Sequence, residues 1–120
     1  MGYSIHIVDK NNQTMKTANG EKHHIKGGIF ILGGTDEASI SITYNYSPYF
    51  YQYIDKEKGI RYLYGRKVKD TVPLLESIIK QMEESDDRDY WTATEGNARK
   101  ALENLLLLAE LFPDGYWDGD

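Results

Sequence analysis

The first half of the chain alternates apolar with polar residues, and this period of two is typical of half-buried β-strands. In the segment 3–8, the apolar side chains of Tyr3, Ile5 and Ile7 share one face, as in a strand. Turns rich in Asn, Asp and Gly separate this segment from other strand-like segments. The pattern predicts an antiparallel meander of about four strands, over residues 3–8, 13–18, 28–32 and 39–44.

The second half repeats apolar residues at the spacing of three and four that characterises α-helices. Capping residues and prolines mark where these helices begin and end. We expect two to three helices, starting at Ser47, at Asp70 or Thr71, and at Thr92 or Thr94, the last one ending before Pro113. Residues 60–64 fit a strand or an irregular turn, and residues after Pro113 are expected to form a tail. Strands followed by helices predict a single α+β domain over residues 1–120, with helices packed on one face of the sheet.

The composition excludes several classes of protein. The chain has 120 residues, which is typical of one domain, no cysteine, and a formal net charge of -5. Without cysteine it has no disulfide framework, thiol nucleophile or Cys-ligated metal site. The longest apolar run, residues 105–109, is far shorter than the ~20 residues that cross a bilayer. There is no signal-peptide pattern, and the mild acidity argues against binding of duplex nucleic acid. We therefore expect a cytoplasmic protein that has no membrane segment.

Tyrosine is the residue type with an unusual distribution. Seven of the ten tyrosines lie between residues 44 and 64, and residues 55–70 hold six bases against three acids. Aromatic faces stack on rings, and arginine binds phosphate with paired hydrogen bonds. This segment predicts a binding site for a small anionic, ring-bearing ligand, with a nucleotide as the leading candidate. The candidate ligand-binding residues here are Tyr44, Asn45, Tyr46, Tyr49, Arg61, Tyr64, Arg66 and Lys67.

The start of the last helix is a second candidate location. Unpaired N–H groups and the helix dipole favour an anion at a helix N-terminus. Trp91 could stack on a ring there and Asn97 could bind polar edges, so both join the candidate ligand-binding residues. The alternative is a capped helix whose tryptophan covers the core.

Two other interpretations of the tyrosine-rich segment stay open. Its tyrosines can be core or rim residues beside a solvated lysine face. The segment can instead be a protein interface, since tyrosine and arginine are common hot-spot residues. The latter interpretation predicts a protein-interaction module or an inhibitor of a host protein, with a homo-oligomer as one form.

Acid–base and metal chemistry have weaker support in the sequence. Asp36 and Glu37 are adjacent, so in a strand their carboxylates would face opposite sides. His6, His23 and His24 do not have the spacing of zinc ligands. We predict no catalytic residue, no metal and no cofactor. A small hydrolase or transferase that uses Asp36, Glu37 or His6 is the third alternative.

Short motifs are spread over nearly the whole chain: Gly33-Gly34-Thr35 with Glu37-Ala38, Thr43-Tyr44-Asn45-Tyr46, Gly59-Ile60-Arg61 with Leu63-Tyr64-Gly65, and Tyr90-Trp91 with Thr94 and Gly96-Asn97-Ala98. In these motifs the chain resembles a family of small phage and bacterial proteins that has no settled activity. The resemblance implies a phage or bacterial cytosolic protein. By analogy, such proteins act against host defence, as sponges for nucleotide signals or as inhibitors of a host protein.

Overall fold

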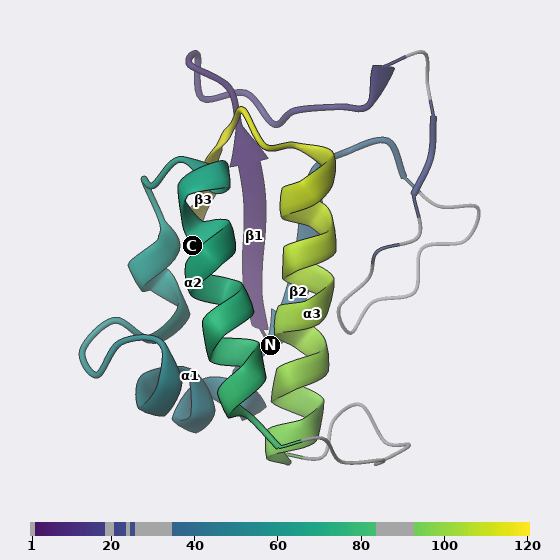
Figure 1. Ribbon diagram of the computed structural model, residues 1–120. Helices are drawn as coiled ribbons and strands as arrows, with labels where there is room; N and C mark the ends of the chain where they lie inside the picture. The colour runs from purple at the N-terminus through teal and green to yellow at the C-terminus, as the bar shows by residue number, and fades with distance from the viewer. Residues whose placement is uncertain (1, 19–20, 24, 26–34, 84–92) are drawn as a thin grey trace.

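A computed structural model describes residues 2–18, 21–23, 25, 35–83 and 93–120 of the chain (Figure 1). The described part contains a three-stranded antiparallel sheet and three α-helices, so the predicted α+β class is confirmed. In chain order the elements are β1 (Gly2–Val8), β2 (Ser39–Thr43), the 3-10 helix η2 (Tyr44–Tyr46), α1 (Ser47–Tyr53), the 3-10 helix η3 (Gly59–Leu63), α2 (Val68–Gln81), α3 (Glu95–Leu111) and β3 (Tyr116–Gly119).

Strand β1 lies in the centre of the sheet, between β2 and β3, and is antiparallel to both. Ile5 lies opposite Ile40 on one side and Gly119 on the other. In the next row, His6 lies opposite Ser39 and Asp118. Because neighbouring positions in a strand face opposite ways, these two rows belong to the two faces of the sheet.

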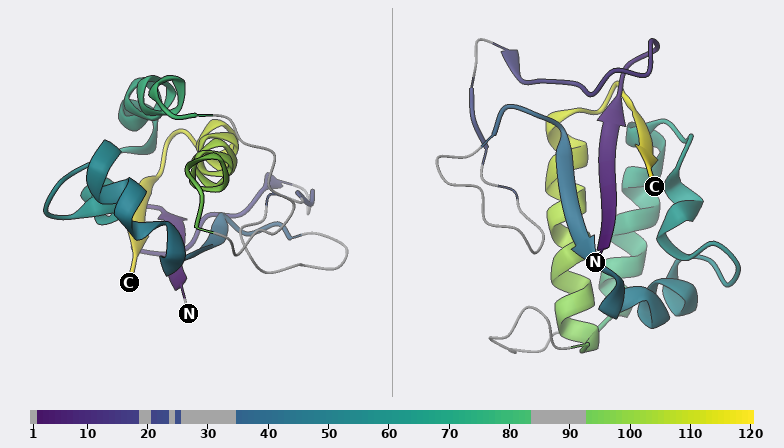
Figure 2. Two further views of the ribbon diagram at one scale, coloured as in Figure 1. Left: turned by 90° about the horizontal axis from the view of Figure 1, so that it is seen from below. Right: turned by 180° about the vertical axis from the view of Figure 1, so that it is seen from behind.

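The two faces of the sheet differ in polarity. Helices α2 and α3 cover one face, and the other face carries no helix in the described part of the chain (Figures 1 and 2). The covered face holds the buried side chains Tyr3, Ile5, Ile7, Ile40, Ile42 and Trp117. The open face holds the polar side chains Ser4, His6, Ser39, Ser41 and Asp118.

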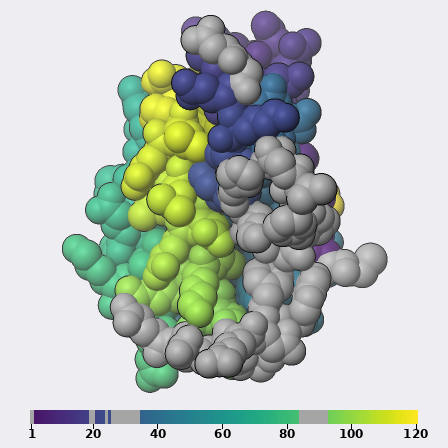
Figure 3. Space-filling view, turned by 90° about the vertical axis from the view of Figure 1, so that its right-hand side faces the viewer, coloured from purple at the N-terminus to yellow at the C-terminus, as the bar shows by residue number. Residues whose placement is uncertain are grey.

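The amphipathic helices complete the core. Leu75 and Ile78 from α2 and Leu102 and Leu105 from α3 are buried in one cluster with the sheet. The apolar spacing at three and four therefore identifies the face of each helix that packs inward. The outer surface of α3 forms one flank of the molecule (Figure 3) and keeps two leucines about half exposed, Leu107 and Leu111.

Two of the predicted strands are not among the strands of the described chain. Residues 13–18 form no strand. Met15 joins the end of β1 to the segment before β2: its N–H donates to the Ile7 carbonyl and its carbonyl accepts from the Ala38 N–H, while the Ile7 N–H donates to the Ala38 carbonyl. Only isolated bridges form here, at Thr14 and Lys16. The predicted strand 28–32 lies outside the described residues.

Strand β3 is the element that the sequence prediction missed, since we expected a tail there. It has only four residues, too few for a clear alternating pattern. Trp117 is 1% exposed, and its indole Nε1 donates a hydrogen bond of 2.8 Å to Thr71 Oγ1 in α2. Residues 116–119 form a strand because they pair with β1 and because this buried contact holds Trp117 against α2.

The helix boundaries differ from the predicted ones by small amounts. Helix α1 begins at Ser47 itself and has Tyr46 as its N-cap, and α2 begins at Val68. Helix α3 uses the second of its two predicted caps, with Thr94 Oγ1 accepting a 3.1 Å hydrogen bond from the Asn97 N–H. The ambiguous segment 60–64 falls mostly within the 3-10 helix η3.

The Trp117–Thr71 hydrogen bond gives a test of how β3 is held. Thr71→Val leaves the buried indole N–H without its acceptor, and we expect a loss of about 1–3 kcal/mol in the free energy of unfolding. Urea unfolding measures this loss. Thr14→Val, which removes a hydroxyl that has no hydrogen bond to a described residue, is the control. In a double-mutant cycle, Thr71→Val and Trp117→Phe together should destabilise less than the sum of the two. Additive effects would contradict the coupling.

Candidate functional site

Several tyrosines of the predicted binding segment serve the packing of the fold. Tyr46 is fully buried, with its ring centroid 6.4 Å from that of Phe50. The hydroxyl of Tyr49 donates to the Ala93 carbonyl at 3.2 Å. Tyr53, a further tyrosine of this segment, donates to a carboxylate oxygen of α3 at 2.8 Å. Tyr49 and Tyr53 thus tie α1 to the beginning of α3, while Tyr46 fills the core, so we leave Tyr46 and Tyr49 out of the candidate site.

The start of α3 is a structural junction. The Glu95 carboxylate accepts hydrogen bonds from the Tyr53 hydroxyl and from the Glu83 N–H, at 2.8 and 2.6 Å. The hydrogen bond to this carboxylate raises the pKa of Tyr53 above its usual value. Asn97 is buried in the first turn of the helix, and its N–H donates to the Thr94 cap. Trp91 lies outside the described residues.

Tyr44 and Arg61 meet at the end of the sheet where β1 begins. Both contact the ring of Tyr3: Tyr44 packs edge to face at 4.7 Å between centroids, and the Arg61 guanidinium lies 5.0 Å from the ring centroid. Arg61 Nε also donates to the Asp120 carbonyl at 2.9 Å. Tyr44 is 37% exposed, and Asn45 beside it is also exposed. We refer to Tyr44, Asn45 and Arg61 as the Tyr44 corner.

Tyr64 lies beside β3, with its hydroxyl close to Gly119. This hydroxyl is buried and has no hydrogen-bond partner among the described residues. Burial raises the pKa of Tyr64 to about 12, the negative charge of Asp120 adds to the rise, and Arg61 opposes it. The side chain therefore stays neutral in the folded protein well above the usual pKa of a tyrosine.

Arg66 and Lys67 belong to a short extended segment along the outer edge of β3. The Gly65 N–H donates to the Trp117 carbonyl at 2.8 Å, and the Trp117 N–H donates to the Arg66 carbonyl at 3.0 Å. Lys67 forms an antiparallel bridge with Tyr116. Directly opposite residues of an antiparallel pair have their side chains on the same face. Lys67 therefore lies beside Tyr116 on the open side of the sheet.

The Arg66 side chain folds back on its own segment. Its guanidinium lies 3.9 Å from the ring centroid of Tyr62, and its Nε donates to the Tyr62 carbonyl at 2.8 Å. The nine predicted binding residues that the structure describes therefore do not converge on one place. Three form the Tyr44 corner, two lie on the segment along β3, Tyr64 lies beside β3, and the others belong to η2, α1 and α3.

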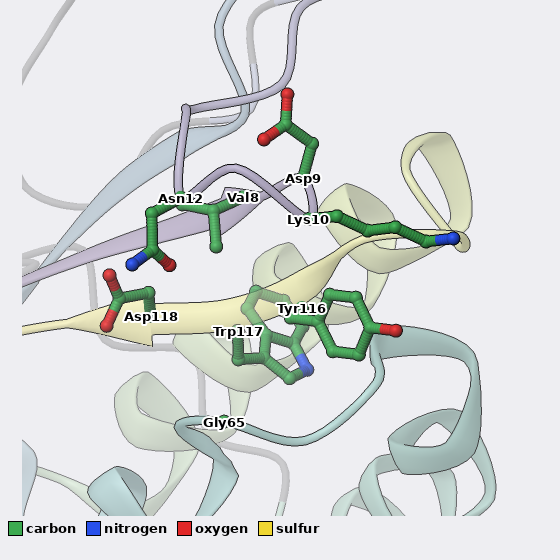
Figure 4. A pocket seen from close by; sticks show the side chains of 8 residues that line it. All are labelled: Val8, Asp9, Lys10, Asn12, Gly65, Tyr116, Trp117 and Asp118. Atoms are coloured by element: carbon green, nitrogen blue, oxygen red, sulfur yellow. The ribbon is translucent and has the colours of Figure 1, made fainter.

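A pocket of about 380 Å³ lies on the open side of the sheet, between the turn that follows β1 and strand β3 (Figure 4). None of the nine predicted binding residues that the structure describes lines it, although Arg66 and Lys67 directly follow the lining residue Gly65. The residues that line this pocket are Val8, Asp9, Lys10, Asn12, Gly65, Tyr116, Trp117 and Asp118. We refer to it as the β3 pocket.

Local hydrogen bonds hold the walls of the β3 pocket in place. Asp9 Oδ1 accepts from the N–H groups of Asn11 and Gln13, at 2.8 and 3.1 Å, which fixes the turn above the pocket. Asn12 in this turn has a φ of 63°, a left-handed conformation that asparagine tolerates. Gly65 has a φ of +84°, and no atom lies within 4 Å of the position that a Cβ would take. The absent side chain at Gly65 leaves the pocket open.

The side chains in the β3 pocket place different chemistry at its two ends. Asn12 and Asp118 turn toward each other at one end, and Lys10 and Tyr116 lie at the other (Figure 4). None of these four side chains forms a hydrogen bond or an ion pair with a described residue. The indole of Trp117 lies toward α2, because its Nε1 bonds to Thr71 there. The pocket therefore offers an amide, a carboxylate, an ammonium and a phenol to a ligand.

The residues of the third alternative, a hydrolase or transferase, do not line the β3 pocket, although His6 lies opposite the lining residue Asp118 on the open face of the sheet. His6 Nδ1 is 2.9 Å from Ser39 Oγ on the open face of the sheet. Glu37 is exposed, and its carbonyl lies 2.7 Å from His23 Nε2. No hydrogen bond or ion pair joins His6 to Asp36 or Glu37. In the described part of the chain, no group of three or more His, Asp or Glu side chains is arranged to hold a metal ion.

Sequence reasoning missed the β3 pocket because its residues had ordinary explanations. The sequence indicates a turn over residues 9–12, and it indicates a C-terminal tail that includes Tyr116 and Asp118. The one available signal was the alternation of Tyr116, Trp117 and Asp118, in which one apolar residue separates two polar ones. A strand in that register puts Tyr116 and Asp118 on the face opposite Trp117.

Comparisons with protein-family models, with curated proteins and with solved structures found no match to this chain. No helix in the described part is both long enough and apolar enough to span a membrane.

The raised pKa of Tyr64 predicts a stability effect at alkaline pH. Below pH 10 the side chain is protonated in the folded and the unfolded protein, so pH has no effect through this group. Between about pH 10 and 12 the unfolded chain loses the proton and the folded one keeps it, so the stability falls as pH rises. Urea unfolding at pH 9 and 11 should show a smaller fall for Tyr64→Phe than for the wild type. The free energy of unfolding of Tyr51→Phe, a change at an exposed site, should fall by as much as that of the wild type. An equal fall in all three proteins would refute the raised pKa of Tyr64.

Proposed function

We propose that this chain is a non-enzymatic binding protein for a small anionic, ring-bearing ligand of the nucleotide class, and that the β3 pocket is its binding site. One observation carries the proposal: four polar side chains without partners among the described residues surround a pocket of about 380 Å³. Ligand pockets commonly have volumes of about 300–1,000 Å³ and a few convergent polar groups.

The end of the pocket near Tyr116 suits the anionic group and the ring. Lys10 lines the pocket, and Lys67 lies beside Tyr116 on the same face of the sheet. A lysine ammonium binds a phosphate oxygen through charge-assisted hydrogen bonds. The half-buried phenol ring of Tyr116 offers a flat surface for a base or sugar. Lys67 does not line the pocket itself, and it is the residue of the predicted basic segment that pairs with the lining residue Tyr116.

The opposite end suits the neutral hydrogen-bonding groups of such a ligand. The Asn12 amide can donate and accept, and the Asp118 carboxylate accepts hydrogen bonds from hydroxyl or amino groups. The turn and the β3 edge that carry these groups are already hydrogen-bonded. Binding then orders little of the backbone, which favours affinity.

We propose that binding occurs without turnover; the described side chains that line the β3 pocket include no nucleophile paired with a base, in keeping with this proposal. A protein of this kind would act by holding its ligand, as a sponge for a nucleotide signal does. We propose that it acts in the cytosol of a bacterium or of an infected host cell, as the sequence leads us to expect.

Thermal unfolding with ribonucleoside mono-, di- and triphosphates tests the proposal. A ligand present at 100 times its Kd adds about 2.7 kcal/mol of stability, which for a domain of this size raises Tm by roughly 10 °C. We expect such a shift with at least one nucleotide. Lys10→Gln should reduce the shift, because the variant loses the charge that holds the phosphate. Lys80→Gln, an exposed lysine in the last turn of α2, is the matched control and should leave the shift unchanged.

Two results would count against this site. The absence of a shift with every nucleotide would remove the proposed function. A shift that Arg61→Ala abolishes and Lys10→Gln does not would move the binding site to the Tyr44 corner, where the Arg61 guanidinium is held against the Tyr3 ring.

A protein-interaction module is the second candidate function, and the Tyr44 corner is the observation that favours it. An exposed tyrosine and an arginine held by neighbouring groups are typical of interface hot spots. The form tested first is a homodimer through this corner. Sedimentation at increasing protein concentration should then show dimers that Tyr44→Ala abolishes, and monomers at every concentration would contradict this form.

A further inference from the structure

We infer that His6 controls the affinity of the β3 pocket for its anionic ligand: the protonated imidazole strengthens binding, and the neutral imidazole weakens it. This inference rests on the proposed function and adds regulation by pH to the same site. It follows from the charge of the pocket lining, from the position of His6 opposite Asp118, and from the hydrogen bond that holds the His6 ring.

The lining of the β3 pocket carries more negative than positive charge. Its charged residues are one base, Lys10, and two acids, Asp9 and Asp118, so its formal charge is -1. Asp9 Oδ1 is bound to two backbone N–H groups of the turn, whereas Asp118 has no hydrogen bond or ion pair with a described residue. A lining of this charge opposes the binding of an anion, and a further positive charge nearby would favour it.

His6 is the residue of β1 that lies directly beside Asp118. The two residues are opposite each other in the pairing of β1 with β3, so their side chains share the open face of the sheet. Directly opposite residues of an antiparallel pair have Cβ atoms about 4.5–5.5 Å apart. His6 does not line the pocket itself, but a charge on its ring acts on the Asp118 carboxylate and on an anion bound beside it.

The hydrogen bond to Ser39 keeps the His6 ring in place in both charge states. Ser39 Oγ lies 2.9 Å from His6 Nδ1 and belongs to β2, on the side of β1 away from Asp118. A serine hydroxyl both donates and accepts, so it can bond to a ring nitrogen with or without a proton. His6 is partly exposed, and its Nε2 has no hydrogen bond to a described residue, so water reaches it. Histidine is the residue type that ordinarily changes charge between pH 5 and 8.

Asp118 is the charged residue directly opposite His6. Strand β2, on the other side of β1, carries no charged side chain. Asp120 is bound to the backbone of β1 through its Oδ1, and its carbonyl accepts from Arg61 Nε, which brings a positive charge to it. Glu37, in the segment before β2, lies opposite Lys16 in an isolated bridge. The other titratable or charged residues of the neighbouring segments are Asp9 and Lys10 in the turn after β1, Asp36 before β2, and Tyr116 on β3.

Isothermal titration calorimetry at pH 5.5 and pH 8.0 tests the inference, with AMP, GMP, CMP, UMP and the matching di- and triphosphates as ligands. For a nucleotide that binds, we expect the wild type to gain about threefold or more in affinity from pH 8.0 to pH 5.5, beyond any change in His6→Gln, because one positive charge is added close to the bound anion. A terminal phosphate also titrates, at a pH of about 6. The comparison with His6→Gln removes that contribution, since both proteins bind the same ligand.

A second variant, His6→Lys, separates the charge of the side chain from its shape. The lysine ammonium is charged at both pH values, so His6→Lys should bind tightly at both. His6→Gln is neutral at both and should bind as weakly as the wild type does at pH 8.0. Lys100→Gln, which removes an exposed charge from α3 on the covered side of the sheet, is the matched control and should keep the wild-type ratio of affinities. Circular dichroism of each variant at both pH values checks that the fold is kept.

The outcomes separate the inference from the proposed function. If no nucleotide binds at either pH, the proposed function fails, and the inference fails with it. If a nucleotide binds and His6→Gln shows the same ratio of affinities between the two pH values as the wild type, the proposed function holds and the inference is wrong. The same conclusion follows if His6→Lys binds no more tightly than His6→Gln at pH 8.0, because His6 would then act through its shape and not through its charge.

Discussion

The burial of Trp117 between the sheet and α2 is the contact on which the described site depends. Its indole is almost fully buried and donates to Thr71, so this side chain must face the helices. Because side chains alternate along a strand, Tyr116 and Asp118 must then face the open side. The backbone of Trp117 also exchanges hydrogen bonds with Gly65 and Arg66. The buried side chain of Trp117 therefore sets the direction of two pocket residues, Tyr116 and Asp118. Its backbone holds the segment of Gly65, another residue that lines the pocket, beside them.

The tyrosine-rich segment shows how the same residue type serves different purposes within 21 residues. Tyr46 fills the core, and Tyr49 and Tyr53 donate their hydroxyls to the start of α3. Tyr44 is exposed at the end of the sheet, against Tyr3. These roles follow from the direction of each side chain on η2 and α1. Successive residues of a short helix at the end of a sheet point their side chains in different directions: into the core, along the surface or into solvent.

The open face of the sheet explains where a ligand can be held. Helices α2 and α3 occupy the other face, so the polar side chains of β1 and β3 meet no helix in the described part of the chain. A flat polar face by itself gives no pocket. The turn after β1 supplies one wall, held by the Asp9 carboxylate, and the missing side chain at Gly65 leaves the space open. Function at the end of a strand, on a loop held by its own hydrogen bonds, is common in proteins.

The sequence by itself determined the α+β class, strands β1 and β2, and the apolar faces of α2 and α3, because periodicity reflects local geometry and burial. It also identified Thr94 as one of two helix caps. Strand β3 and the position of Met15 were decided by tertiary structure, since four residues carry too little pattern and the Met15 hydrogen bonds reach two other segments of the chain. The β3 pocket was decided in the same way. Its walls come from residues 8–12, 65 and 116–118, and only the docking of β3 brings these distant segments together.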